Sequence, residues 1–271
     1  MAMSSGMTEP SETFMPPTSP LVADSSWTQE NPLSPQKEDR NLQLSGIPAA
    51  NGITESAHAS EEQQKFIEDQ LGEEIRLGRV SESFRSELLP GMYSVLMHTV
   101  PKPNSDKLHL VVDHTAGEYS LNSMIDVDAI KGTKLDGLHS LGASLLEFRK
   151  DHPDEKLLLF KSDVSQAFCR LPMHQLWQAK QVLTFRGQWH INHCNNFGGR
   201  GSPKVWISFM SLMAWIAIHH TLIKALKLYM DNSFSFEVAG WTLYYEPYQC
   251  HFPEKQTHLL QLWDEIGVPH D

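Results

Sequence analysis

Cysteine is scarce in this sequence, whose 271 residues contain only three: Cys169, Cys194 and Cys250. An odd, scattered set does not form a disulfide framework, so we expect a reducing, intracellular compartment and no disulfide-linked partner. The N-terminus also lacks the apolar run that a secretory signal requires. The sequence does not distinguish the nucleus from the cytoplasm.

Positive charge is also lacking, since 22 Lys and Arg stand against 33 Asp and Glu, for a net charge of -11. An acidic total argues against broad electrostatic binding of nucleic acid, which depends on Lys and Arg contacts to phosphate. The charge is unevenly spread: residues 1–60 hold 2 basic and 7 acidic side chains, and residues 161–271 hold 9 and 8. The objection to nucleic acid is therefore weakest for the C-terminal part.

No long uninterrupted apolar run is present. The most apolar segment, 205–223, is at the short end of the ~20 residues that span a membrane. It contains Ser208, Ser211, His219 and His220. We expect a buried core helix here and no membrane partner, with a membrane-anchored protein as the alternative.

Residues 1–59 are rich in Ser, Pro, Thr and Glu and have no apolar periodicity, which predicts a disordered tail. Order is predicted to start at Ser60, because Ser60-Glu61-Glu62-Gln63 has the form of a capping box. The apolar residues that follow recur at helical spacing up to Gly78. The sequence therefore predicts one folded domain over residues 60–271.

Apolar periodicity and turn signals predict the elements of this domain. The predicted strands are 93–100, 108–112, 157–163, 182–185 and 189–193, and the predicted helices are 138–150, 204–226 and 256–266. A glycine-rich loop, 197–203, precedes the second of these helices.

Two aspartates stand on strongly apolar elements. Asp231 lies within the apolar stretch 228–236, which reads as a tight hairpin with an acidic tip, and Asp163 ends the apolar strand 157–163. A carboxylate in such a place is costly unless it is paired, and a shared divalent metal would pair both. Two strand-borne aspartates therefore suggest phosphoryl-transfer chemistry. On spacing alone, aspartates that merely cap turns at strand ends remain an alternative.

Taken in order, several segments resemble the reverse transcriptase domain of retroelements, in particular gypsy-like elements, over about residues 64–270. The similar segments are Glu73–Val80, Val100-Pro101-Lys102-Pro103, Leu110-Val111-Val112-Asp113, Ser120-Leu121-Asn122, Lys161–Phe168, Asn196-Phe197-Gly198-Gly199 with Ser202-Pro203, and Tyr229-Met230-Asp231-Asn232. Each match is modest, and their shared order is what indicates the family.

The resemblance implies a role for each matching residue. Asp163 and Asp231 would bind two Mg²⁺ ions with help from the Val164 carbonyl, and the ions would activate the primer hydroxyl and neutralise the triphosphate. Lys102 would reach the triphosphate. Phe168 would stand under the sugar and exclude a 2′-hydroxyl.

The resemblance also implies that Phe197 and Gly198 line the templating base pair, where a glycine permits close approach. The alternative is that Phe168 and Phe197 are ordinary core residues and that Lys102 is a solvated turn residue.

Departures from the family pattern reduce the activity that we expect. Asn232 stands where the family has a second aspartate, so an oxygen ligand is kept but a negative charge is lost. His109 replaces a usual arginine, which removes a fork of donors for the triphosphate, and Asn196 replaces a usual proline. The sequence ends at Asp271, before the family's pyrophosphate-protonating lysine, primer grip and thumb.

The resemblance therefore predicts an α+β fold made of the fingers and partial palm of a right-hand polymerase, without the thumb. A central antiparallel sheet is expected to hold Asp163 and Asp231, with the three long helices packed on it. The expected function is RNA-directed DNA polymerisation by descent, through two-metal nucleotidyl transfer on a template-primer of RNA or DNA with deoxynucleoside triphosphates. We expect this chain to be inactive or weakly active. The alternative is a non-catalytic nucleic-acid-binding or scaffolding protein that kept the fold.

Overall fold

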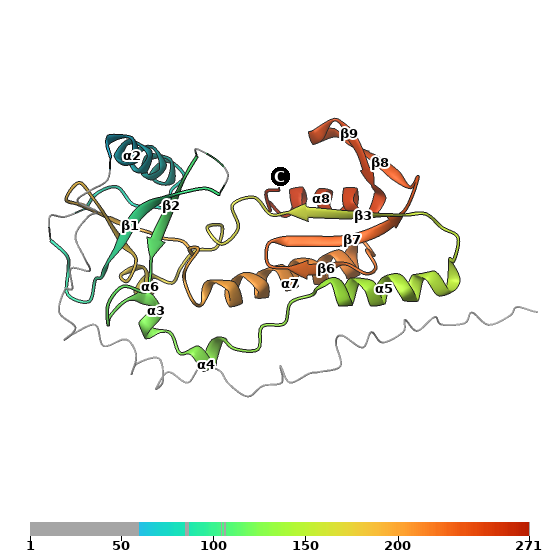
Figure 1. The fold of residues 1–271 in the computed structure, drawn as a ribbon, viewed down its shortest axis with the longest axis horizontal. Helices are drawn as coiled ribbons and strands as arrows, with labels where there is room; N and C mark the ends of the chain where they lie inside the picture. Colours follow the sequence, from blue (N-terminus) through green and yellow to red (C-terminus); the bar gives the residue numbers. More distant parts are fainter. Residues whose placement is uncertain (1–59, 85–86, 104, 106, 271) are drawn as a thin grey trace, which may run out of the picture. The chain divides into compact units, whose positions relative to one another are not determined.

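The computed structural model describes residues 60–84, 87–103, 105 and 107–270 (Figure 1). The predicted disordered tail lies outside these residues. The helices are α2 (Glu61–Arg76), α3 (Leu121–Met124), α4 (Val127–Ile130), α5 (Leu138–Asp151), α6 (Gln175–Gln178), α7 (Ser202–His220) and α8 (Glu254–Glu265), with a 3₁₀ turn η1 (Glu246–Tyr248). The strands are β1 (Ser94–Pro101), β2 (Leu108–Asp113), β3 (Leu157–Asp163), β4 (Val182–Phe185), β5 (Gln188–Ile191), β6 (Lys227–Tyr229), β7 (Asn232–Val238), β8 (Thr242–Tyr245) and β9 (Cys250–Pro253).

Helix α2 begins where the capping box predicts. The Gln63 amide N–H donates to Ser60 Oγ at 3.2 Å, and the Ser60 N–H donates to Gln63 Oε1 at 2.9 Å. These two bonds satisfy amide groups that the first turn of a helix leaves without partners. Ile67 and Leu71 are the buried residues of α2. They pack with residues of β1 and β4, including Val95 and Leu183, in one hydrophobic cluster.

The described residues include the antiparallel sheet expected to hold Asp163 and Asp231, together with a second sheet and a separate pair of strands. The described residues form a four-stranded sheet in the order β2-β1-β4-β5, a three-stranded sheet in the order β3-β7-β6, and the two-stranded pair β8-β9. The four-stranded sheet is mixed, because β1 pairs with β4 in parallel while its other pairs are antiparallel. The three-stranded sheet is antiparallel throughout and is the one that ends at Asp163. The α+β class and an antiparallel sheet that holds Asp163 and Asp231 are therefore as predicted, whereas the parallel pairing of β1 with β4 is a feature that the sequence does not predict.

A second hydrophobic cluster lies around α7 and α8. Trp206, Met210 and Trp263 have no exposed surface and pack in this cluster with Leu259 and Leu260. In Figure 1, α8 runs alongside β3 and β7, and the Gln256 side chain donates to the Lys161 carbonyl at 3.1 Å. This packing fixes β3, and therefore Asp163 at its end.

Helix α7 ends at His220, six residues before the predicted end at residue 226. Leu222 and Ala225 adopt left-handed backbone conformations, with φ of 57° and 62°, and no helix continues through such residues. The chain then enters β6. Among the described residues, no helix is long and apolar enough to cross a membrane.

Candidate functional site

The acidic tip forms as predicted. Strands β6 and β7 pair with Tyr229 opposite Asn232, which leaves Met230 and Asp231 as a two-residue turn. Met230 has a φ of 54°, a left-handed conformation that is costly for any residue with a Cβ atom. Such strain persists only where the surroundings enforce it, and it is typical of functional turns.

Strand β3 brings the second aspartate to this turn. Asp163 lies directly opposite Asn232 in the β3–β7 register. The next residue, Val164, donates its backbone N–H to the Asp231 carbonyl at 3.1 Å. The structure therefore places Asp163, Asp231, Asn232 and the Val164 backbone together at one end of the three-stranded sheet.

The Asn232 carboxamide changes the chemistry of this end. Its Nδ2 donates to Asp231 Oδ1 at 2.8 Å, so one oxygen of the second carboxylate is already engaged by a neighbouring side chain. Its Oδ1 is buried and has no hydrogen-bond partner. An orphaned amide oxygen beside two carboxylates is a ligand that Mg²⁺ accepts.

These oxygen ligands are of the kind that a hard divalent cation prefers, although only the two carboxylates carry a negative charge. In the part of the chain that the structure describes, no cluster of three or more His, Cys, Asp or Glu residues could hold a metal ion. The side-chain oxygens that the strand registers bring to this turn belong to Asp163, Asp231 and Asn232. Mg²⁺ keeps several waters and usually takes one or two protein carboxylates together with substrate phosphates, so two carboxylates at one turn are compatible with its usual coordination.

The loop after β3 is strained, and two of its residues, Ala167 and Phe168, are buried. Gln166 and Phe168 have φ values of 53° and 60°. Phe168 is only 5% exposed and contacts the ring of Phe197 edge-on, with centroids 4.6 Å apart, and the ring of Trp206 at 5.6 Å. Its burial agrees with the alternative that Phe168 is a core residue.

A cleft of about 830 Å³ brings together four of the six residues predicted to bind nucleotide. Lys102, His109, Phe197 and Gly198 all line it, between α2 and the β1–β2 hairpin. Lys102 closes the hairpin turn, since its N–H donates to the Lys107 carbonyl at 2.8 Å. The described lining of the cleft includes Cys169 but not Phe168, Val164, Asp163 or Asp231. The predicted residues thus fall into two groups, which the Phe168–Phe197 contact links.

Helix α3 holds the glycine-rich loop through the side chain of Asn122. Asn122 donates to the Gly198 carbonyl at 2.8 Å, and its Oδ1 accepts from the Arg200 N–H at 2.6 Å. Gly198 has a φ of 87°, and a Cβ atom there would lie 3.4 Å from the Val112 carbonyl oxygen. A side chain at residue 198 would therefore be strained, which explains the glycine.

Buried polar residues support the same loop. Asn196 lies between two buried side chains: its Oδ1 accepts from Asn192 at 3.0 Å, and its Nδ2 donates to Gln181 at 3.3 Å. A proline, usual at this place in the resembled family, could make neither bond. No periodicity or motif in the sequence signals the roles of Asn192 and Gln181.

His114 is a further residue without a sequence signal. Both of its ring nitrogens are buried and lack hydrogen-bond partners, and its ring lies 3.7 Å from where a Cβ atom of Gly198 would stand. Burial lowers the pKa of His114 to about 4, although the nearby Asp113 acts in the opposite direction. A neutral imidazole therefore packs behind the loop at neutral pH.

Two solved structures are similar to this fold. The structure of a foamy viral protease-reverse transcriptase dRH in complex with double-stranded DNA matches with a TM-score of 0.57 and 14% identity, covering 84% of this chain and 34% of that chain. The foamy viral protease-reverse transcriptase in complex with double-stranded DNA matches with a TM-score of 0.57 and 16% identity, covering 83% and 40%. No protein-family model and no curated protein matches the sequence.

The chain therefore has a reverse-transcriptase-like fold. It spans between 34% and 40% of the length of these two solved chains. The predicted likeness to gypsy-like elements in particular is not distinguished by these matches, and it stays a prediction.

Proposed function

We propose that this chain is a retroelement-derived, reverse-transcriptase-like domain, built for nucleotidyl transfer and weakened at its metal site. In this proposal α2 and the four-stranded sheet are the fingers, and the three-stranded sheet with α5, α7 and α8 is the partial palm. The observation that carries it is the β3–β7 register, which sets Asp163 against the Asp231-Asn232 turn.

The residues divide into two proposed roles. Asp163 and Asp231 would hold two Mg²⁺ ions when a nucleotide is present, and the ions would supply charge neutralisation and an activated primer hydroxyl. Lys102, His109, Phe197 and Gly198 would hold the incoming deoxynucleoside triphosphate and its template base from the cleft. The Asn232–Asp231 hydrogen bond supports low activity, because it occupies a carboxylate oxygen that a metal ion needs.

A template-primer of RNA or DNA is the proposed partner. The two similar solved proteins are in complex with double-stranded DNA. Between Asp163 and Asp231 the chain contains no Asp or Glu, and its Lys and Arg residues there are Arg170, Lys180, Arg186, Arg200, Lys204, Lys224 and Lys227. This interval gives the acidic chain a local excess of positive charge, which a protein needs in order to bind nucleic acid.

We predict that Lys102→Ala weakens binding of a fluorescent deoxynucleoside triphosphate with Mg²⁺ by about tenfold, as expected for the loss of one charge-assisted contact to phosphate. Fluorescence anisotropy at fixed ionic strength measures this affinity. Lys131→Ala is the matched control, because Lys131 is exposed, pairs with Asp128 and does not line the cleft. Equal affinities for both variants would show that Lys102 does not contact the bound nucleotide.

The same charged interval favours one alternative, a non-catalytic nucleic-acid-binding protein that kept the fold. Such a protein would bind a single-stranded oligonucleotide with an affinity that falls steeply with salt, because bound Lys and Arg release counterions. It would bind neither Mg²⁺ nor nucleoside triphosphate at the turn. Oligonucleotide binding without triphosphate binding would therefore support the alternative and contradict the proposed function.

A further inference from the structure

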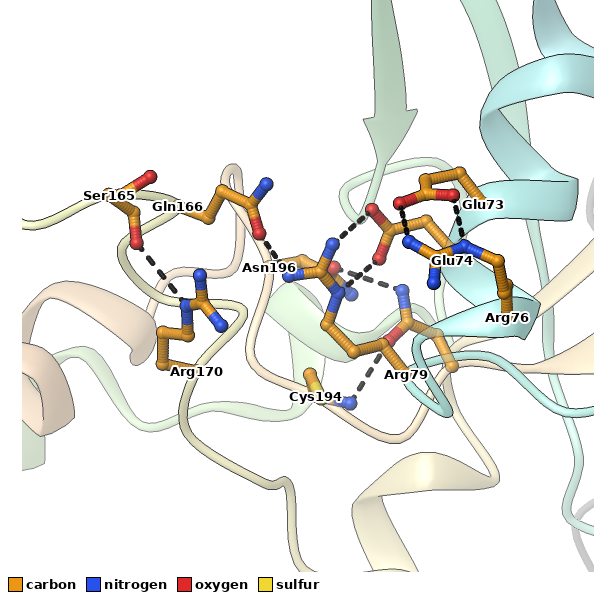
Figure 2. A network of polar contacts seen from close by, with 10 residues as sticks. Glu73, Glu74, Arg76, Arg79, Ser165, Gln166, Arg170, Cys194 and Asn196 are labelled. Atoms are coloured by element: carbon orange, nitrogen blue, oxygen red, sulfur yellow. Dashed lines mark hydrogen bonds and ion pairs between the residues drawn. The ribbon is translucent and has the colours of Figure 1, made fainter. Parts of the chain in front are cut away.

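Arg79 joins helix α2 to the loop that follows Asp163. Its Nε and Nη2 donate to the two carboxylate oxygens of Glu74 at 2.7 and 2.8 Å, and its Nη1 donates to Gln166 Oε1 at 2.6 Å. Figure 2 shows the Arg79 guanidinium between Glu74 and Gln166. The Arg79 side chain thus hydrogen-bonds to Glu74, 5 residues before it, and to Gln166, 87 residues after it.

Arg79 itself is firmly placed. Its side chain is 10% exposed, and its backbone carbonyl accepts from the His193 N–H at 2.8 Å. The bidentate bond to Glu74 fixes the plane of the guanidinium, because two parallel bonds leave no rotation. The third donor is therefore presented to Gln166 in a fixed direction.

Gln166 needs such support. Its left-handed backbone is unfavourable for a residue with a Cβ atom and persists only when the surroundings enforce it. On the other side of the loop, the Ser165 N–H donates to the Pro269 carbonyl at 2.9 Å, and the Ser165 carbonyl accepts from Arg170 at 3.3 Å. Arg79 supplies the hydrogen bond that holds the Gln166 side chain.

We infer that Arg79 is a positioning residue for the nucleotide site: through Gln166 it holds the loop 165–168 in the strained conformation that packs Phe168 against Phe197. The expected functional consequence is selection of the nucleotide sugar, and this part of the inference rests on the proposed function. The structural part, that Arg79 orders this loop, can be tested without any catalytic activity.

Cys169 provides the reporter for that test. It follows Phe168 directly and lines the cleft, and burial raises the pKa of its thiol to about 11. A well-ordered loop therefore leaves Cys169 slow to react with a maleimide at neutral pH, since the thiolate is the nucleophile. Replacing Cys194 and Cys250 by serine leaves Cys169 as the one thiol of the chain.

In this background, Arg79→Lys and Gln166→Ala are expected to raise the rate of N-ethylmaleimide labelling by about tenfold, because local opening becomes easier once a charge-assisted hydrogen bond is lost. Mass spectrometry follows the labelling. Gln166→Glu keeps an acceptor for Arg79 and should restore slow labelling. Arg76→Lys is the matched control, because Arg76 makes the same kind of pair with Glu73 but both side chains are exposed and neither reaches the loop (Figure 2).

Circular dichroism shows whether each variant folds. If Arg79→Lys does not fold, Gln166→Ala decides, because it leaves the Arg79–Glu74 pair intact. Labelling of Arg79→Lys and Gln166→Ala at the rate of Arg76→Lys would overturn the inference.

The functional part uses competition between dTTP and UTP for the fluorescent nucleotide with Mg²⁺. The preference for dTTP is expected to fall by about fivefold in Gln166→Ala relative to Arg76→Lys, on the scale of one neutral contact. If the unaltered chain binds no nucleotide, the proposed function is contradicted, and the labelling rates still decide the role of Arg79.

Discussion

Without metal ions, the variant Asn232→Asp is expected to unfold at a lower temperature than the natural chain, and Mn²⁺ is expected to reverse that order. The substitution places a carboxylate opposite Asp163 and beside Asp231, where Asn232 now donates a hydrogen bond. Two unit charges 4 Å apart repel by about 4 kcal/mol at an effective dielectric constant near 20, before relaxation and solvent reduce the value. We expect a loss of about 2 kcal/mol, or roughly 4–8 °C in melting temperature for a domain of this size.

Mn²⁺ should act in the opposite direction, because three carboxylates at one turn attract a divalent cation that two carboxylates and an amide hold weakly. A ligand present at 100 times its Kd stabilises the folded state by about 2.7 kcal/mol. Differential scanning calorimetry with and without Mn²⁺ measures both effects. Asn232→Ala is the control, because it removes the hydrogen bond without adding a charge. An equal response of all three chains to Mn²⁺ would show that no metal binds at this turn.

Trp263→Ala is expected to lower the free energy of unfolding by about 3–5 kcal/mol, the usual loss when a large aromatic side chain is removed from a core. Trp263 has no exposed surface and lies among the buried residues of α7 and α8. Its carbonyl also accepts from the Val268 N–H at 2.8 Å, just before Pro269 bonds to the loop at Ser165. Loosening α8 should therefore also loosen the loop after Asp163.

Trp215→Ala is the matched control for this measurement. Trp215 lies on α7 but is 55% exposed, so its removal should change stability by no more than about 0.5 kcal/mol. Urea unfolding followed by circular dichroism compares the two variants. A similar loss for both would contradict the arrangement of α7 and α8.

The local parts of the site were predictable from the sequence because they depend on neighbouring residues. The capping box at Ser60 follows from a short-range pattern. The hairpin with Asp231 at its tip and the strand that ends at Asp163 follow from runs of apolar residues. The segment order then indicated a reverse-transcriptase-like fold, which the solved structures support.

The long-range parts were not predictable. That Asn232 stands opposite Asp163 depends on a strand register over some 70 residues, which no local pattern fixes. The bond from Arg79 to Gln166 spans 87 residues, and nothing near Arg79 in the sequence indicates it. Burial of Phe168 likewise depends on Trp206, which belongs to a helix much later in the chain.

Two elements were missed for a different reason, which is an unusual backbone. The hairpin β8–β9 turns through η1 and Gln249, which has a φ of 50°, so the glycine or Asn-Gly signal of a tight turn is absent. The end of α7 is likewise set by left-handed Leu222 and Ala225. The sequence does not show which apolar residues adopt a positive φ, because tertiary packing enforces that conformation.

Primer extension on poly(rA)/oligo(dT) with Mg²⁺ or Mn²⁺ tests the central proposal most directly, that Asp163 and the Asp231-Asn232 turn form a weakened nucleotidyl-transfer site. We predict little or no extension by the natural chain, extension by Asn232→Asp, and at least a hundredfold less when Asp163→Ala is added, about the scale of removing one group that stabilises the transition state. Extension by the natural chain that equals that of Asn232→Asp would contradict the weakening. Extension that survives Asp163→Ala, or silence in every folded variant, would contradict the site itself.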